Sequence, residues 1–135
     1  VKAYAYSLTF QQSREKPVKV PSDVQEFLDK YSRDLVSGNV ERIMANFSDR
    51  FLNQRRKRAF YETWFQNSPD SPIQRGLISS EATVTVFEAQ GDKAYVDGFF
   101  ASKARDNPDK ALKEPMGFRQ IIKENGQWKW YGEQR

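Results

Sequence analysis

From Ser22 onward, the hydrophobic pattern of this 135-residue chain changes once, from helical spacing to alternation. In the first half, apolar residues lie three or four positions apart, at Val24, Phe27, Leu28, Tyr31 and Leu35. From Leu77 onward, β-branched and aromatic residues form short runs such as residues 83–87 and 95–100. Helical spacing predicts amphipathic helices, and alternation predicts half-buried strands. Helices followed by strands indicate an α+β domain rather than repeated βαβ units.

Three helices are expected in the first half. A capping box at residues 22–25 begins the first helix, with Ser22 as its N-cap, and a glycine ends it. Asn39 can cap a second, short helix that continues to about residue 47. The third helix covers about residues 54–67 and carries Phe60 and Trp64 on its apolar stripe. Residues 68–76 are punctuated by proline and glycine and are expected to form a loop.

The pair Asn125-Gly126 is the strongest hairpin signal in the second half. A two-residue turn there pairs Ile121 with Trp130, and Lys123 with Trp128. Arg119 then shares a face with Ile121 and both tryptophans. We expect this face to lie against the helices.

A second turn at Gly91-Asp92 predicts another hairpin, while residues 105–113 are expected to be a polar connection. The turn pairs Val86 with Asp97 and Val84 with Phe99, which places these four residues on one face. Asp97 is then a candidate buried acid. Thr85 and Gly98 leave the opposite face open as the buried one, so an exposed or ion-paired Asp97 remains an alternative.

The chain contains no cysteine and no histidine, which removes several kinds of site. Zinc sites, disulfides and histidine-dependent catalytic relays are excluded, so only carboxylate, Tyr, Lys and Arg chemistry is available. Neither a metal nor a cofactor is expected. Ten Phe, six Tyr and three Trp residues indicate that rings fill much of the core or line a pocket. We expect this core or pocket to include Phe60, Trp64, Phe99, Trp128 and Trp130.

The length indicates one domain, which we place at residues 22–135, preceded by an extended arm or linker at residues 1–21. The first residue is Val1 rather than Met, which suggests a processed or excised segment. We therefore expect an exported, periplasmic bacterial protein, with a cytoplasmic location as the alternative. No apolar run is long enough to span a membrane.

Two segments of the chain resemble motifs of the nuclear transport factor 2-like superfamily. Its opening motif is similar to Leu35-Val36-Ser37-Gly38-Asn39-Val40-Glu41 together with Phe47-Ser48-Asp49-Arg50-Phe51. Its closing hairpin is similar to residues 120–130, which include Gly126-Gln127-Trp128-Lys129. The resemblance covers about residues 22–135. It implies a cystatin-like cone, in which three N-terminal helices pack into a curved, mostly antiparallel sheet around a pocket.

Members of this superfamily include ketosteroid isomerase, scytalone dehydratase, limonene epoxide hydrolase and polyketide cyclases, so the fold alone does not assign a reaction. No complete catalytic set of these enzymes maps onto this sequence. The resemblance therefore favours a non-catalytic domain that binds a small apolar or aromatic ligand or a protein, as an accessory domain of a cell-envelope protein. The candidate ligand-binding residues are Tyr61, Trp64, Asp97, Phe99, Arg119 and Trp130.

The alternative function is a small isomerase, dehydratase or cyclase that acts on an apolar ring compound. In that case Asp97 is the general base in an aromatic pocket, and Tyr61 or Arg119 polarises a carbonyl group. Desolvation would raise the pKa of such a buried acid. For Arg119 an exposed or structurally paired side chain remains the competing interpretation, and for Tyr61 and Trp64 a place in the core.

The net charge of +4 is concentrated in residues 50–58, which include Arg55, Arg56, Lys57 and Arg58. This run is interpreted as a solvated helix face. The alternative is a footprint for an anionic polymer, although a nucleic-acid partner is not expected. A homodimer is expected through the outer sheet face, where Thr83, Thr85, Lys129 and Tyr131 would suit a polar interface.

Overall fold

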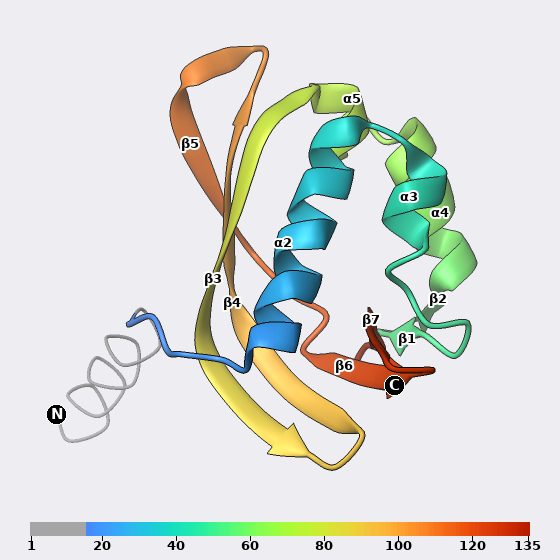
Figure 1. The fold of residues 1–135 in the computed structure, drawn as a ribbon. Helices are drawn as coiled ribbons and strands as arrows, with labels where there is room; N and C mark the ends of the chain where they lie inside the picture. Colours follow the sequence, from blue (N-terminus) through green and yellow to red (C-terminus); the bar gives the residue numbers. More distant parts are fainter. Residues whose placement is uncertain (1–15) are drawn as a thin grey trace, which may run out of the picture.

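The computed structural model describes residues 16–135 (Figure 1). The predicted arm therefore lies mostly outside the described residues. In the described part of the arm, the amide of Val18 donates to the carbonyl oxygen of Val84 at 2.9 Å, so this part of the chain runs beside the sheet. Among residues 16–135, no helix has the length and apolar character needed to cross a membrane.

Four helices precede the main sheet: α2 (Ser22–Ser37), α3 (Val40–Met44), α4 (Arg58–Asn67) and α5 (Pro72–Arg75). The predicted cap of α2 is wrong, because Pro21 occupies the N-cap and no side chain caps the helix. Gly38 ends α2 in the left-handed conformation, as predicted. The Asn39 side chain caps α3 by accepting from the Arg42 amide at 3.1 Å. Helix α5 lies in the predicted loop, where Ser71 caps it and Pro72 begins it.

The third predicted helix begins four residues later than expected. Residues 52–57 form a small hairpin of β1 (Leu52–Asn53) and β2 (Arg56–Lys57), and only then does α4 begin. Both turn residues, Gln54 and Arg55, have positive φ. The basic run therefore lies mainly on the β1–β2 hairpin rather than on a helix face. Phe60, expected on the buried stripe of this helix, is 40% exposed.

The main sheet contains β3 (Leu77–Gln90), β4 (Lys93–Ala104), β5 (Asn107–Pro115), β6 (Gln120–Glu124) and β7 (Gln127–Trp130). The order is β3-β4-β6-β7, and β5 pairs with the other half of β4. All of these pairings are antiparallel. The long strands β3 and β4 curve around α2, so the helices lie on the concave side of the sheet (Figure 1). The α+β prediction is confirmed, but β5 was expected to be a loop.

One predicted register is confirmed and the other holds only near its turn. Ile121 pairs with Trp130 and Lys123 with Trp128, as the Asn125-Gly126 turn requires. Val86 pairs with Asp97, but a bulge then shifts the register. Val84 therefore pairs with Gly98, and Phe99 pairs with Thr83. The prediction that Val84 shares a face with Asp97 is wrong, because the extra residue turns Val84 towards the helices.

Gly98 marks a close approach of the β3 and β4 backbones. A Cβ atom on Gly98 would collide with the carbonyl oxygen of Thr83 and lie 2.9 Å from the Cα atom of Val84. Only glycine permits this approach of the two backbones. The bulge and Gly98 together help to turn a flat hairpin into the curved wall of the cone.

Aromatic rings fill the centre of the fold, as the composition predicts. Trp130 is fully buried, and its ring lies 5.3 Å from that of Phe27 and 5.5 Å from that of Tyr31. Phe47 makes further edge contacts with Tyr31 and Phe118. Such ring pairs add about 0.5–1.5 kcal/mol each to the free energy of area burial. Helix α2 is thereby fixed against β7.

Candidate functional site

An aromatic cavity of about 140 Å³ lies between α2, α4, α5 and the concave face of the sheet. Its walls come from five separate segments of the sequence. They consist of Tyr31, Leu35, Tyr61, Trp64, Phe65, Pro72, Arg75, Leu77, Phe100, Ser102, Glu114, Pro115, Met116 and Phe118. Apolar and aromatic walls with a few polar groups are typical of small-molecule sites.

Two tyrosines supply the inner polar groups of this cavity. Tyr31 lies on the buried stripe of α2, and Tyr61 lies on α4 with its ring 5.2 Å from that of Phe118. Burial raises the pKa of Tyr31 far above the usual tyrosine value, and the neighbouring Tyr61 raises it further. The Tyr31 hydroxyl is therefore a neutral hydrogen-bond donor. Neither hydroxyl bonds to another group of residues 16–135.

The remaining polar groups of the cavity are bonded to each other or to neighbours. Nη1 of Arg75 donates to Oε1 of Glu114 at 2.8 Å, and the Arg75 side chain is only 16% exposed. The Ser102 hydroxyl bonds to that of Ser80 at 3.2 Å. Glu114 is the single carboxylate among the described lining residues, and Arg75 holds it in an ion pair. The cavity can therefore donate hydrogen bonds to a ligand from its two tyrosines.

The structure divides the predicted site residues into three groups. Tyr61 and Trp64 line the aromatic cavity. Trp130 lies within the core, at 0% exposure, and does not line it. Asp97, Phe99 and Arg119 line a separate depression of about 190 Å³, together with Thr85, Gly98, Pro115 and Gly117.

This second depression lies on the convex face of the sheet. The even-numbered residues Ala94, Val96 and Phe100 of β4 belong to the core, and neighbouring strand residues point to opposite faces. Asp97 and Phe99 therefore point away from the helices. Asp97 is 6% exposed, and its Oδ1 accepts from the Gly98 amide at 2.8 Å. The expectation that Asp97 faces an aromatic pocket beneath the helices is thus wrong.

Arg119 departs from the predicted face for a local reason. Its φ of 67° turns the chain just before β6, so the alternation that begins at Gln120 does not extend back to it. The side chain is 44% exposed, and Nε lies 3.2 Å from Oε1 of Glu133. Arg119 is therefore held in an ion pair at the surface.

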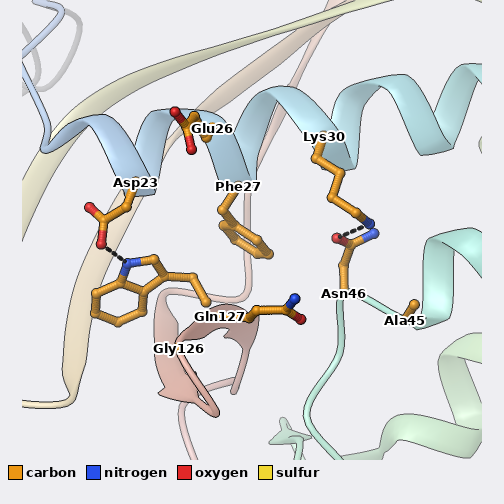
Figure 2. A pocket seen from close by; sticks show the side chains of 9 residues that line it. Asp23, Glu26, Phe27, Lys30, Ala45, Asn46, Gly126 and Gln127 are labelled. Atoms are coloured by element: carbon orange, nitrogen blue, oxygen red, sulfur yellow. Dashed lines mark hydrogen bonds between the residues drawn. The ribbon is translucent and has the colours of Figure 1, made fainter.

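A groove of about 220 Å³ separates α2 from the β6–β7 hairpin (Figure 2). Nε1 of Trp128 donates to Oδ2 of Asp23 at 2.8 Å, and Nζ of Lys123 lies 3.2 Å from the same oxygen. These two donors lower the pKa of Asp23. Nζ of Lys30 donates to Oδ1 of Asn46 at 3.2 Å across the other end of the groove. These contacts tie α2 to the hairpin and to the segment after α3.

Sequence reasoning missed Tyr31 and Arg75 as lining residues. Tyr31 is the one hydroxyl-bearing ring on the buried stripe of α2, which is a signal that the sequence does contain. Arg75 offers no such signal, because helix α5 was expected to be a loop. No group of three or more metal-ligating side chains occurs within the described part of the chain.

The sequence matches no protein-family model and none of the curated proteins. Its fold is similar to solved structures. A nuclear transport factor 2-like protein of unknown function from Shewanella oneidensis MR-1 has a TM-score of 0.61 at 13% identity, over 81% of this chain and 92% of that chain. A cystatin-like protein of unknown function from Nostoc punctiforme PCC 73102 has a TM-score of 0.59 at 13% identity, over 84% and 90%.

A third similar structure carries an enzyme name. It is a protein from Novosphingobium aromaticivorans DSM 12444 that is provisionally named a scytalone dehydratase, with a TM-score of 0.57 at 15% identity, over 81% of this chain and 77% of that chain. At these identities the similarity establishes the fold alone. The chain therefore has the nuclear transport factor 2-like, cystatin-like fold that its two motifs predict.

Proposed function

We propose that this chain is a ligand-binding domain, and that the aromatic cavity binds a small compound with one ring and one hydrogen-bond acceptor. The observation that carries the proposal is the pair of tyrosine hydroxyls, Tyr31 and Tyr61, without protein partners among residues 16–135 in an aromatic cavity. Both hydroxyls are therefore available to donate to a ligand oxygen, and such a hydrogen bond contributes about 0.5–1.5 kcal/mol.

The volume of the cavity limits the ligand to one ring. An engineered cavity of about 150 Å³ in another protein binds benzene, and the cavity here measures about 140 Å³. We expect a neutral ligand, because the burial that raises the pKa of Tyr31 also disfavours a negatively charged group beside its hydroxyl. A phenol or a cyclic ketone has the required size and acceptor.

Binding without turnover is the favoured activity. The one carboxylate in the described lining, Glu114, is already paired with Arg75, and Asp97 lies on the other face of the sheet. An isomerase or dehydratase that uses Asp97 on a ligand in this cavity is therefore disfavoured, because a general base must reach the proton that it removes.

The test compares phenol with toluene by calorimetry and by ligand-observed NMR. Phenol carries a hydroxyl group where toluene carries a methyl group. We expect phenol to bind more tightly than toluene, and Tyr31→Phe to weaken phenol binding by about 2- to 12-fold, the loss of one hydrogen bond. Tyr95→Phe is the matched control, because Tyr95 is a half-buried tyrosine on the convex face. The proposal fails if neither compound binds, or if both tyrosine variants behave alike.

Two expectations of the sequence remain predictions. The first is that the domain belongs to an exported bacterial protein of the cell envelope, which fractionation of cells would test. The second is a homodimer through the convex sheet face, which sedimentation at several concentrations would test.

A further inference from the structure

The β1–β2 hairpin and the start of α4 form a basic hairpin surface, which we define as Arg55, Arg56, Lys57 and Phe60. All four residues are exposed. It lies at the opposite end of the molecule from the protruding β4–β5 hairpin (Figure 1). The aromatic cavity and its proposed ligand make no use of it.

The hairpin that carries these cations is firmly held at its turn. Gln54 and Arg55 have φ values of 51° and 65°, a backbone usually supplied by Asn and Gly in two-residue hairpins. The amide of Arg55 donates to the carbonyl oxygen of Arg135 at 3.0 Å, and that of Gln134 donates to Leu52 at 2.8 Å. The Arg55 side chain is therefore displayed from a fixed point.

The positive charge of this surface is poorly compensated within the protein. Arg55, Arg56 and Lys57 form no ion pair with any carboxylate of residues 16–135. Arg58 lies 3.9 Å from Glu62, the nearest acidic partner on the same helix. Lys57 is the N-cap of α4 and provides no side-chain cap, so cations stand at the positive end of the helix dipole. An anionic partner would relieve the repulsion among these cations and their repulsion by the helix dipole.

Arg56 and Phe60 form a stack at the surface. The guanidinium carbon of Arg56 lies 4.3 Å from the centroid of the Phe60 ring, and Phe60 is 40% exposed. A similar pair lies alongside, where Arg50 covers Tyr131 at 5.6 Å and the Leu52 amide bonds to the Tyr131 carbonyl oxygen. A guanidinium that stacks on a ring can offer its other face to a planar base and its edge donors to phosphate.

We infer that the basic hairpin surface binds single-stranded nucleic acid. Such a strand presents both phosphates and unstacked bases, which match the cations and the Arg56–Phe60 stack. A lipid surface fits less well, because insertion needs several apolar side chains. The other exposed large apolar residues, Val18, Ile78 and Leu112, lie on different elements. The inference departs from the sequence interpretation, which placed these cations on a solvated helix face.

Fluorescence anisotropy of a labelled 20-nucleotide oligothymidine, at several salt concentrations, tests the electrostatic part. Three or four phosphate contacts predict a slope of about −2 to −3 for log affinity against log salt. We expect R55A/K57A, which leaves the Arg56–Phe60 stack in place, to reduce the magnitude of that slope by about 1.4 and to weaken binding about tenfold at low salt. The control is K103A/K110A, which removes the same charge from exposed residues of the β4–β5 hairpin. It should bind almost as the parent chain does.

The Phe60→Leu variant tests the stacking part without changing charge. We expect it to bind the oligonucleotide about fivefold more weakly, since a stacked base contributes at least about that factor. Unchanged binding by Phe60→Leu would overturn the inference in favour of charge alone. Stronger binding to phosphatidylglycerol vesicles, which the oligonucleotide fails to displace, would overturn it in favour of a membrane. Absence of oligonucleotide binding at low salt would overturn it outright.

Discussion

The two faces of the sheet carry hollows of similar size that use their polar groups in opposite ways. On the concave face, the hydroxyls of Tyr31 and Tyr61 bond to no group of residues 16–135. On the convex face, Asp97 accepts from the Gly98 amide, and Arg119 pairs with Glu133. Polar groups that are already bonded serve the fold, whereas unbonded groups in an apolar wall are available to a ligand.

Substitution of the adjacent residues Phe99 and Phe100 is the most direct test of the difference between the two faces. Phe100 is 8% exposed and belongs to both the core and the cavity wall, whereas Phe99 is half-buried on the convex face. We expect Phe100→Ala to lower the free energy of unfolding by about 3 kcal/mol or more. Phe99→Ala should cost about 1 kcal/mol, mainly through its contact with Lys113. Urea unfolding of both variants measures the difference.

Equal losses in these two variants would contradict the assignment of faces along β4. A larger loss for Phe99→Ala would mean that the better-packed ring lies on the convex side. Because the two substitutions are chemically identical and adjacent in the sequence, effects on the unfolded chain largely cancel between them.

Substitution of Gly98 tests whether the close approach of β3 and β4 is needed for stability. A methyl group at this position would meet the backbone of Thr83 and Val84, and neither can move without shifting β3. We expect Gly98→Ala to lower the free energy of unfolding by about 2 kcal/mol, through strain at a close backbone approach. The matched control is Gly91→Ala in the β3–β4 turn, whose Cβ would meet no atom within 4 Å but whose φ is also positive. If Gly91→Ala proves the more harmful, positive φ rather than the close approach decides the stability.

The fold was largely predictable because its signals are local. Asn125-Gly126 fixes the pairing of Ile121 with Trp130, and Asn39 and Gly38 delimit α2 and α3. The failures occur where distant segments decide the backbone. The bulge between Val84 and Val86 depends on the curvature of the whole sheet, and β5 forms because β4 provides an edge to pair with.

The candidate site was predictable only in part, for the same reason. Tyr61 and Trp64 were identified from their helical stripe and do line the cavity. Asp97 was assigned to the wrong face because Val84 and Val86 were expected to share one face, whereas the bulge in β3 turns Val84 alone towards the helices. Arg75 and Glu114 meet across 39 positions of sequence, which no spacing rule indicates.

The unfolding free energies of Tyr31→Phe and Arg119→Met compare a polar group without a protein partner with one that is held in an ion pair. Tyr31→Phe should change the free energy of unfolding by no more than about 0.5 kcal/mol, because its hydroxyl has no hydrogen bond to residues 16–135 that the substitution would break. Arg119→Met should lower it slightly, by about 0.5 kcal/mol, since it breaks a surface ion pair. Destabilisation by Tyr31→Phe in the absence of ligand would mean that the hydroxyl serves the fold.

The smallest expected effect concerns Asp23, whose carboxylate is bonded in the groove rather than available. The indole of Trp128 and the ammonium of Lys123 lower the pKa of Asp23 below its ordinary value of 3.8. A carboxylate with a lowered folded-state pKa stabilises the protein above pH 3.8, and this contribution is lost as the pH falls through the lower folded value. Since the Asp23 side chain is 46% exposed, we expect only about 0.5 kcal/mol from it.

Trp128→Phe removes the larger of the two donors to Asp23, together with some packing that does not depend on pH. The difference in unfolding free energy between the parent chain and Trp128→Phe, measured by urea titration at neutral pH and at about pH 2, should therefore shrink at the acidic value. A difference that stays constant would show that the indole contributes through packing alone and that Asp23 is not held by the groove.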